Sequence, residues 1–148
     1  MEIYTGNPSP VYEKYGPSIG VWHTGLVTDM SELFFHAGGF NEDITKWDTS
    51  AVTNMRFIFA FAGDLNQDLS VWNTSAVTDM SGMFAGAGQF NGDLSDWDTS
   101  AVTDMSSMFS GAGKFTGNEY LSGWNTSAVT GMQKMFQDAV SFIGDISD

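Results

Sequence analysis

The sequence predicts an α/β repeat solenoid, a coil of stacked units that each contribute one short parallel strand and one short helix. Tryptophan recurs at an interval of 25 residues, which lengthens once to 27. Apolar residues follow each tryptophan at helical spacing, and a short aliphatic segment precedes it. A fixed period of this size is typical of arrays in which each unit buries its apolar face against its neighbours. The tryptophans are Trp22, Trp47, Trp72, Trp97 and Trp124.

The predicted helix of each unit follows its tryptophan. In the first unit, Met30 is followed at i+3 and i+4 by Leu33 and Phe34, and at i+7 by an alanine. This spacing forms one apolar stripe along two helical turns, so we expect the stripe to face a core. A threonine before the stripe, such as Thr28, can accept a hydrogen bond from the first turn. A glycine after the alanine, such as Gly38, is typical of a helix end.

The predicted strand lies where one unit passes into the next. An aliphatic residue stands three positions before each tryptophan, as in the segment from Ile44 to Asp48. We expect the strands of successive units to pair in parallel. The tryptophan ring would then be a largely buried wedge between the strand layer and the helix layer.

The chain is expected to form one repeat domain. Its 148 residues, 42% of them hydrophobic, can bury one continuous core. Residues 1–18 are predicted to be a leader or cap, and residues 19–148 a single solenoid of about five repeats with an incomplete last coil. The units start near Ile19, Ile44, Leu69, Leu94 and Leu121.

The repeated motif resembles a known family. The third unit reads WNTSAVTDMSGMFAGAGQFNGDLSD from Trp72 to Asp96, and the fourth opens WDTSAVTDMSSMF. From about Tyr15 to Asp148 the chain is similar to bacterial surface-protein repeats of about 25 or 26 residues, grouped with the BspA-like leucine-rich repeats. The resemblance implies a leucine-rich-repeat-like, right-handed solenoid on secreted or surface-anchored proteins, associated with adhesion and protein binding. It implies no catalytic residues.

Composition and charge argue against several partners. Eighteen acidic residues against five basic ones give a net charge of −13, which repels nucleic acid and anionic membrane surfaces. No run of eighteen apolar residues predicts membrane insertion, and residues 1–20 lack the pattern of a signal peptide. An extracellular or cell-surface location is therefore implied only by the family resemblance. The absence of cysteine removes disulfides and thiolate metal sites.

No catalytic grouping stands out in the sequence. His23 and His36 are the only histidines, and no pattern of a nucleophile with histidine and aspartate accompanies the abundant serines and threonines. Phosphate-binding glycine motifs are also missing. We expect a protein that is not an enzyme and holds no cofactor.

Recurring carboxylates raise the alternative of a calcium-stabilised domain. Asp43, Asp68 and Asp93 stand in one column, and Asp48 and Asp98 stand in another. Clustered oxygens are the ligands that calcium prefers. The competing interpretation is that these side chains accept hydrogen bonds from their own backbone and fix turns.

Polar columns next to tryptophan have two interpretations as well. Asn73 and Asn125 stand in formal glycosylation sequons, which the repeat itself explains. A threonine ladder that includes Thr49, Thr74 and Thr99 could order water or contact a sugar. We favour hydroxyl groups that hydrogen-bond to neighbouring backbone.

Three aromatic residues predict an interaction patch. Phe57 and Phe61 stand four residues apart on outward positions of the second predicted helix, with Phe35 available from the first unit. Exposed aromatics of this kind mark interfaces. The alternative is that the leader folds back and covers them.

The last unit predicts a stacking end. The chain given stops before another tryptophan, so Phe142, Ile143 and Ile146 are expected at an unpaired edge. We therefore expect a non-enzymatic surface module that binds a protein or a glycan. One alternative is a structural protomer that stacks head-to-tail with copies of itself into a fibre or surface assembly. The other is the calcium-stabilised binding domain.

Overall fold

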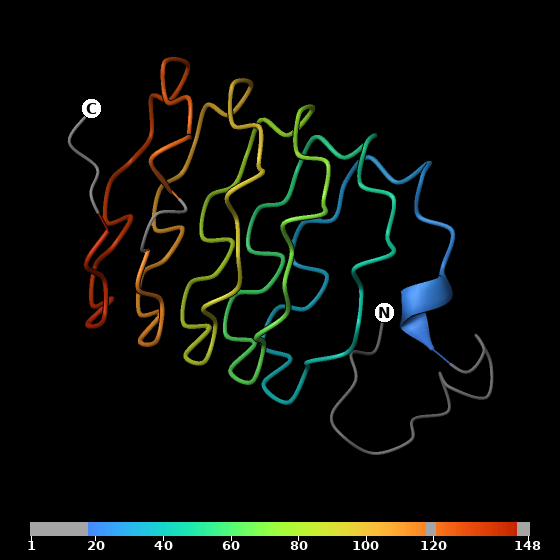
Figure 1. Ribbon diagram of the computed structural model, residues 1–148, viewed down its shortest axis with the longest axis horizontal. Coiled ribbons are helices and arrows are strands. Elements are labelled where there is room, and N and C mark those ends of the chain that lie inside the picture. The colour runs from blue at the N-terminus through green and yellow to red at the C-terminus, as the bar shows by residue number, and fades with distance from the viewer. Residues whose placement is uncertain (1–17, 118–120, 145–148) are drawn as a thin grey trace.

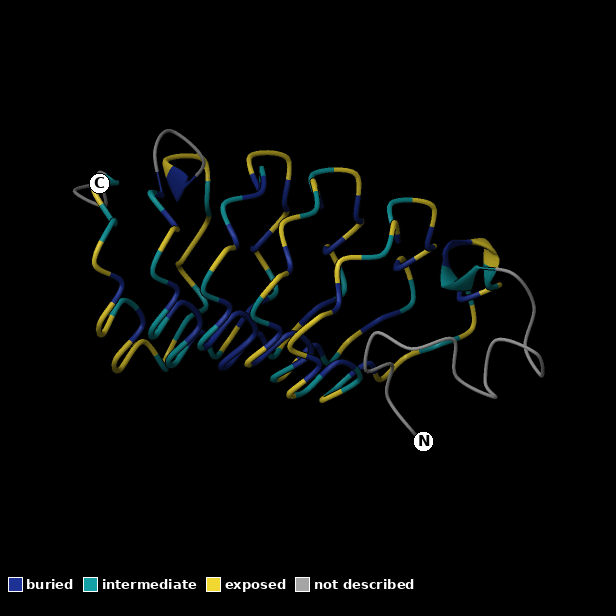
Figure 2. Ribbon diagram, turned by 90° about the horizontal axis from the view of Figure 1, so that it is seen from below, coloured by how far each residue is buried: buried dark blue, intermediate teal, exposed yellow. Residues whose placement is uncertain are grey.

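The computed structural model describes residues 18–117 and 121–144. The chain winds into a stack of coils, and each repeat contributes one coil in sequence order along the long axis (Figure 1). The one helix that lies wholly within the described residues is η1, a 3-10 helix over Ile19–Val21 that Ser18 caps. The pattern of buried and exposed positions recurs from coil to coil (Figure 2). The leader prediction falls almost entirely outside the described residues.

The predicted fold class, an α/β repeat solenoid, is wrong. The described residues contain no α-helix and no sheet, so neither the helix at Met30 nor the strand from Ile44 to Asp48 forms. Within residues 18–117 and 121–144, parallel pairing occurs only as isolated bridges, at a position just before the predicted helix. These bridges join Asp29 to Asn54, Asn54 to Asp79, Asp79 to Asp104, and Asp104 to Gly131. The architecture is a stack of coils built from turns.

Consecutive turns replace the predicted helix. In the first coil, the N–H groups of Leu33, Phe35 and Ala37 each donate to the carbonyl three residues earlier, at 3.0–3.3 Å. The N–H groups of the residues between them donate to the next coil instead. Met30 donates to the carbonyl of Asn54 at 2.9 Å, and the same connection repeats two, four and six residues later. Each coil is therefore hydrogen-bonded to its neighbour through every second residue.

Left-handed residues make this path possible. Two positions in each run of turns have positive φ, at about +52° to +70°, where a right-handed helix cannot continue. The first of these positions holds Glu32, Phe57, Gly82, Ser107 and Lys134. The second holds His36, Phe61, Gly86, Gly111 and Asp138. Each turn advances the chain by three residues, and one further residue separates it from the next turn. Apolar residues at i, i+3, i+4 and i+7 therefore still face inward.

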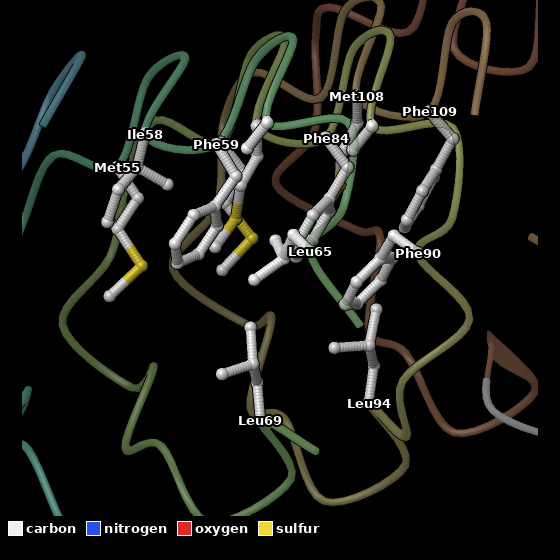
Figure 3. Packing of buried hydrophobic residues seen from close by; sticks show 14 of the residues in the cluster. Met55, Ile58, Phe59, Leu65, Leu69, Phe84, Phe90, Leu94, Met108 and Phe109 are labelled. Carbon is white, nitrogen blue, oxygen red and sulfur yellow. The ribbon is translucent and has the colours of Figure 1, made fainter. Parts of the chain in front are cut away.

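The predicted apolar columns are confirmed as the core. In the second coil, Met55, Ile58, Phe59 and Ala62 are fully buried. Phenylalanine rings from successive coils lie in a row inside the stack (Figure 3), with ring centroids 5.7 Å apart between Phe59 and Phe84 and 5.5 Å apart between Phe84 and Phe109. The core is thus one continuous layer that runs through the stack.

The tryptophans line a second part of this core. Trp47, Trp72 and Trp97 are no more than 4% exposed, which confirms the predicted burial for the interior coils. Trp47 and Trp72 stack with centroids 6.4 Å apart and an interplanar angle of 2°. The indole N–H of Trp97 donates to the carbonyl of Leu69 in the preceding coil at 2.8 Å. Each of these three rings is therefore buried in the shared core and is tied by a hydrogen bond to the preceding coil.

Polar side chains connect the coils where backbone groups do not. The Thr74 hydroxyl, 1% exposed, donates to the carbonyl of Asp98 in the next coil at 2.9 Å. Thr24, Thr49 and Thr99 make the equivalent bond. This confirms that the threonine ladder satisfies backbone carbonyls. Thr28, predicted to cap a helix, instead accepts at its carbonyl from the N–H and the hydroxyl of Thr53.

Candidate functional site

The aspartate columns are used by the turns. Asp43 Oδ1 accepts hydrogen bonds from both the backbone N–H and the hydroxyl of Thr45, at 3.0 and 2.7 Å. Asp68 and Asp93 accept from the N–H two residues later in the same way. These contacts are the turn-fixing interactions that the competing interpretation predicted.

The second aspartate column behaves identically. Asp48 Oδ1 accepts from the N–H of Ser50 at 3.0 Å and from its hydroxyl at 2.6 Å. Asn73 makes the same two bonds with Ser75 through its amide oxygen, which supports a shared acceptor role. In residues 18–117 and 121–144, no group of three or more histidine, aspartate or glutamate side chains is placed to hold a metal ion.

These hydrogen bonds lower the pKa values of several carboxyl groups. The Ser50 hydroxyl and then the Ser50 N–H hold the pKa of Asp48 below its ordinary value of 3.8. Thr45 lowers the pKa of Asp43 in the same order of causes. The charged carboxylate is the better acceptor, so each bond favours the ionised form.

The three phenylalanines of the predicted interaction patch lie close together, and two further residues contact them. The ring of Phe35 contacts Phe61 edge-on, with centroids 5.9 Å apart, and Phe57 with centroids 6.3 Å apart. His36 stacks on Phe61 at 4.6 Å with an interplanar angle of 9°. The Arg56 guanidinium lies 4.5 Å from the centre of the Phe57 ring. We call Phe35, His36, Arg56, Phe57 and Phe61 the aromatic cluster.

The aromatic cluster lies at the surface of the first two coils. Phe61 is 47% exposed, Phe35 and Phe57 are half-buried, and His36 and Arg56 are exposed. Arg56 also forms an ion pair with Glu32 at 3.3 Å, and both side chains are about half exposed. The cluster therefore offers ring faces, ring edges and a charged pair to the solvent.

Glycine in the third coil leaves room for this cluster. The Phe57 ring lies over Gly82, and the Phe61 ring lies over Gly86, so that a side chain at either glycine would overlap the ring. Sequence reasoning missed His36 and Arg56 because it treated the run as a helix. If the run were a helix, His36 and Arg56 would not be expected to contact the three phenylalanines, which come from two coils.

A cavity of about 410 Å³ lies at the first coil. Its lining is mostly apolar and includes Val27, Met30, Leu33 and Trp47. In the interior of the stack, the corresponding residues are buried in the core. The cavity thus marks the face of the first coil on which a preceding coil would pack.

The predicted stacking end is only partly described. Ile143 is 77% exposed, while Phe142 is half-buried and stacks on Phe136 at 3.9 Å. Ile143 donates its N–H to the carbonyl of Thr116 in the fourth coil at 2.9 Å. Ile146 lies outside the described residues. Met132 and Val140 add exposed apolar surface to this coil, at 44% and 85% exposed.

Comparisons with known proteins give one family. The family described as "Mycoplasma protein of unknown function, DUF285" matches residues 10–119 and again residues 66–148. The overlap of the two matches is expected for a chain with an internal repeat. No curated protein and no solved structure matches the chain. Among the described residues there is no helix with the length and apolar character needed to cross a bilayer.

Proposed function

We propose that this chain, which belongs to the DUF285 family, is a non-enzymatic repeat module that binds a protein or glycan ligand through its aromatic cluster. The observation that carries the proposal is the backbone conformation of His36, Phe57 and Phe61. All three have φ between +52° and +60°. Such a conformation costs a non-glycine residue about 1–2 kcal/mol.

The third coil has the cheaper alternative at the same two positions. Gly82 and Gly86 have φ of +61° and +66° and carry no side chain to strain. The first coil instead has His36 at the second of these positions, and the second coil has Phe57 and Phe61 at both, with all three rings partly in water. An aromatic residue at such a position costs free energy through its left-handed backbone and through the exposure of its ring to water. Both costs support a role for these rings in contact with another molecule.

The chemistry of the aromatic cluster favours a protein ligand over a glycan. The phenylalanine rings offer no hydrogen-bonding groups, and the cluster's polar groups come from His36 and Arg56. Aromatic and arginine side chains together are typical of the residues that dominate protein interfaces. The resemblance to surface-protein repeats supports an extracellular or cell-surface location for this contact.

Removal of the rings tests this proposal. The double variant Phe57→Gly with Phe61→Gly gives the second coil the residues that the third coil already has at these positions, so its backbone path is preserved. Binding would be measured against immobilised extracellular proteins and a glycan array. We expect the variant to lose about tenfold or more in affinity for a protein ligand of the parent chain.

The matched control is Leu26→Ala. Leu26 is 96% exposed and lies outside the aromatic cluster, and the other four coils carry alanine at its position. Unchanged binding is expected for this control. Ligand binding that survives loss of both rings would contradict the role of the cluster, and ring-dependent binding to glycans alone would reassign the ligand class. Turnover that depends on one side chain would contradict a non-enzymatic module.

A second candidate function is a structural protomer that assembles with copies of itself. Backbone hydrogen-bonding groups at the two ends of the described stack favour it, because the groups at one end complement those at the other. The calcium-stabilised domain is a third candidate, which a chelation experiment tests.

A further inference from the structure

We propose that the last described coil of one copy docks on the first coil of a second copy, in the register that joins neighbouring coils within the chain. The inference concerns the two ends of the stack and not the aromatic side chains, so it goes beyond the proposed ligand-binding surface. It specifies how the structural protomer of the second candidate function would assemble.

Unused N–H groups mark the last coil. In every earlier coil, four alternating N–H groups donate to the next coil, as from Met105 to Gly131 at 2.7 Å and from Phe109 to Met135 at 2.9 Å. The equivalent groups in the last coil have no acceptor among the described residues. They belong to Met132, Lys134, Phe136 and Asp138.

Unused carbonyl groups mark the first coil. In every later coil, four alternating carbonyls accept from the preceding coil, as at Asn54 and Arg56. The equivalent carbonyls of the first coil have no donor among the described residues. They belong to Asp29, Ser31, Leu33 and Phe35. Four donors and four acceptors with the same spacing are thus left at opposite ends of one stack, and an unpaired row of this kind is a template for another chain.

Apolar surface supports the same contact. The last coil exposes 44% of Met132 and leaves Phe136 half-buried, although the equivalent residues of the three interior coils are fully buried. The first coil has the cavity lined by Val27, Met30 and Leu33. Docking would place Met132 and Phe136 where each interior coil presents the same columns to its neighbour. The apolar layer would then continue from one copy into the next.

Charge at the two ends is complementary. Lys134 and Glu32 occupy the same left-handed position in the last and first coils, so docking puts an ammonium group beside a carboxylate. In a chain with a net charge of −13, unspecific contact between copies is repulsive, and this pair of opposite charges favours one orientation. Because the two surfaces differ, the contact repeats from copy to copy and builds a linear chain or a ring.

Sedimentation velocity with charge-reversal variants tests the docking. The full chain is expected to form larger species as its concentration rises. Lys134→Glu and Glu32→Lys, each alone, place like charges at the contact and are expected to weaken association about fivefold. The double variant reverses the pair and should recover most of that loss. Lys114→Glu makes the same charge change on an exposed residue of the fourth coil and should leave association unchanged.

Cross-linking provides a second readout that does not depend on affinity. The chain has no cysteine, so Glu32→Cys with Lys134→Cys introduces the only two thiols. Neighbouring coils of a docked pair place these positions about 4.8 Å apart, within the span of a disulfide of about 4.4–6.8 Å, whereas within one chain four such steps separate them by about 19 Å. Mild oxidation is expected to give a ladder of multimers. Glu32→Cys with Lys114→Cys should give none beyond dimers.

Two outcomes would overturn the docking. One is a chain that stays monomeric at every concentration, as would follow if another part of the chain occupied the first coil's face. The other is a cysteine pair that forms no more multimers than its control. Neither outcome bears on ligand binding by the aromatic cluster. The variant that tests ligand binding, Phe57→Gly with Phe61→Gly, leaves the donors and acceptors at both ends in place, so the two proposals can fail independently.

Discussion

The ring of Phe57 occupies the space into which a side chain on Gly82 would project. The two residues hold the same left-handed position in successive coils, with φ of +52° and +61°. The Phe57 ring in the second coil therefore requires glycine at this position of the third coil. Phe57 over Gly82 and Phe61 over Gly86 are thus two matched packing contacts between the second and third coils.

The variant Gly82→Ala is expected to lower the free energy of unfolding by about 1–3 kcal/mol, because the added methyl group must displace the Phe57 ring. Phe57→Gly in the same chain should restore the part of that loss due to overlap. Urea denaturation measures both. Gly111→Ala is the matched control: Gly111 has φ of +70°, but a Cβ there would lie 3.7 Å from the Gly86 backbone, so only the conformational cost remains. Equal losses at Gly82 and Gly111 would refute the overlap.

Thr74→Val is expected to cost about 1–3 kcal/mol of stability, because it leaves the Asp98 carbonyl without its buried hydroxyl donor. The comparison is Thr78→Val, which removes a hydroxyl bond of 3.1 Å to the Thr53 carbonyl. Thr78 is exposed, and its own N–H still donates to the same carbonyl, so a loss below about 1 kcal/mol is expected. Thermal or urea unfolding separates the two, and a larger loss for Thr78→Val would contradict the buried role of the threonine ladder.

Acid is expected to destabilise the fold through the turn carboxylates. The pKa values of Asp29, Asp43, Asp48 and Asp98 are lowered by hydrogen bonds from serine or threonine two residues later. Since the folded pKa lies below the unfolded one, the stabilisation is fully present above the unfolded value near 3.8. It is lost as the pH falls through the lower folded values.

Asp48→Asn with Asp98→Asn tests that origin. Asparagine already stands in this column at Asn73 and Asn125, where its amide oxygen accepts the same backbone bond without titrating. At pH 7 the variant should have about the same denaturation midpoint as the parent chain. Below pH 3.8 it should lose less stability than the parent chain does. Denaturation midpoints across the acid range give the answer. An unchanged acid profile would show that other carboxyl groups dominate.

Phe84→Ala is expected to lower stability by about 3–5 kcal/mol. Phe84 is fully buried and stacks between Phe59 and Phe109, so truncation opens a cavity in the middle of the ring row. Val71→Ala, at a residue that is 64% exposed, is the control and should change stability by no more than about 0.5 kcal/mol. Similar urea midpoints for the two variants would argue against a continuous core.

Calcium is expected to leave the melting temperature unchanged, as is its removal by a chelator. Oδ1 of Asp43, Asp48, Asp68 and Asp93 already accepts hydrogen bonds within its own turn. A cation would have to compete with those bonds at each position. A melting temperature that rises with added calcium and falls after chelation would revive the calcium-stabilised domain.

The sequence predicted which residues are buried better than it predicted how the backbone buries them. The columns at Met55, Phe59 and Ala62 are core, as their spacing indicated, because a run of turns brings the same positions inward as a helix does. The prediction of a helix was wrong because the N–H of every second residue donates to the next coil and not to a carbonyl of its own run. Gly82 and Gly86, four residues apart inside the supposed helix, were the available signal against it, since glycine is unfavourable in a helix interior.

The candidate site was predicted in part for a related reason. Phe35, Phe57 and Phe61 were correctly grouped, since neighbouring repeats place equivalent positions side by side in any stacked fold. The contacts of His36 with Phe61 and of Arg56 with Phe57 depend on the left-handed backbone at these positions. Local periodicity carries no information on that backbone reversal.

Every hydrogen bond between coils in the described chain joins immediate neighbours, through residues 24 to 30 apart in sequence. No coil therefore depends directly on one further along. A gene of this kind can gain or lose a whole unit by unequal recombination, and the remaining coils meet through the same bonds as before. Alleles could therefore differ in the number of units, and so in the length of the stack, while the chemistry at each end stays the same. This form of variation is the one that a stack of equivalent coils permits most readily.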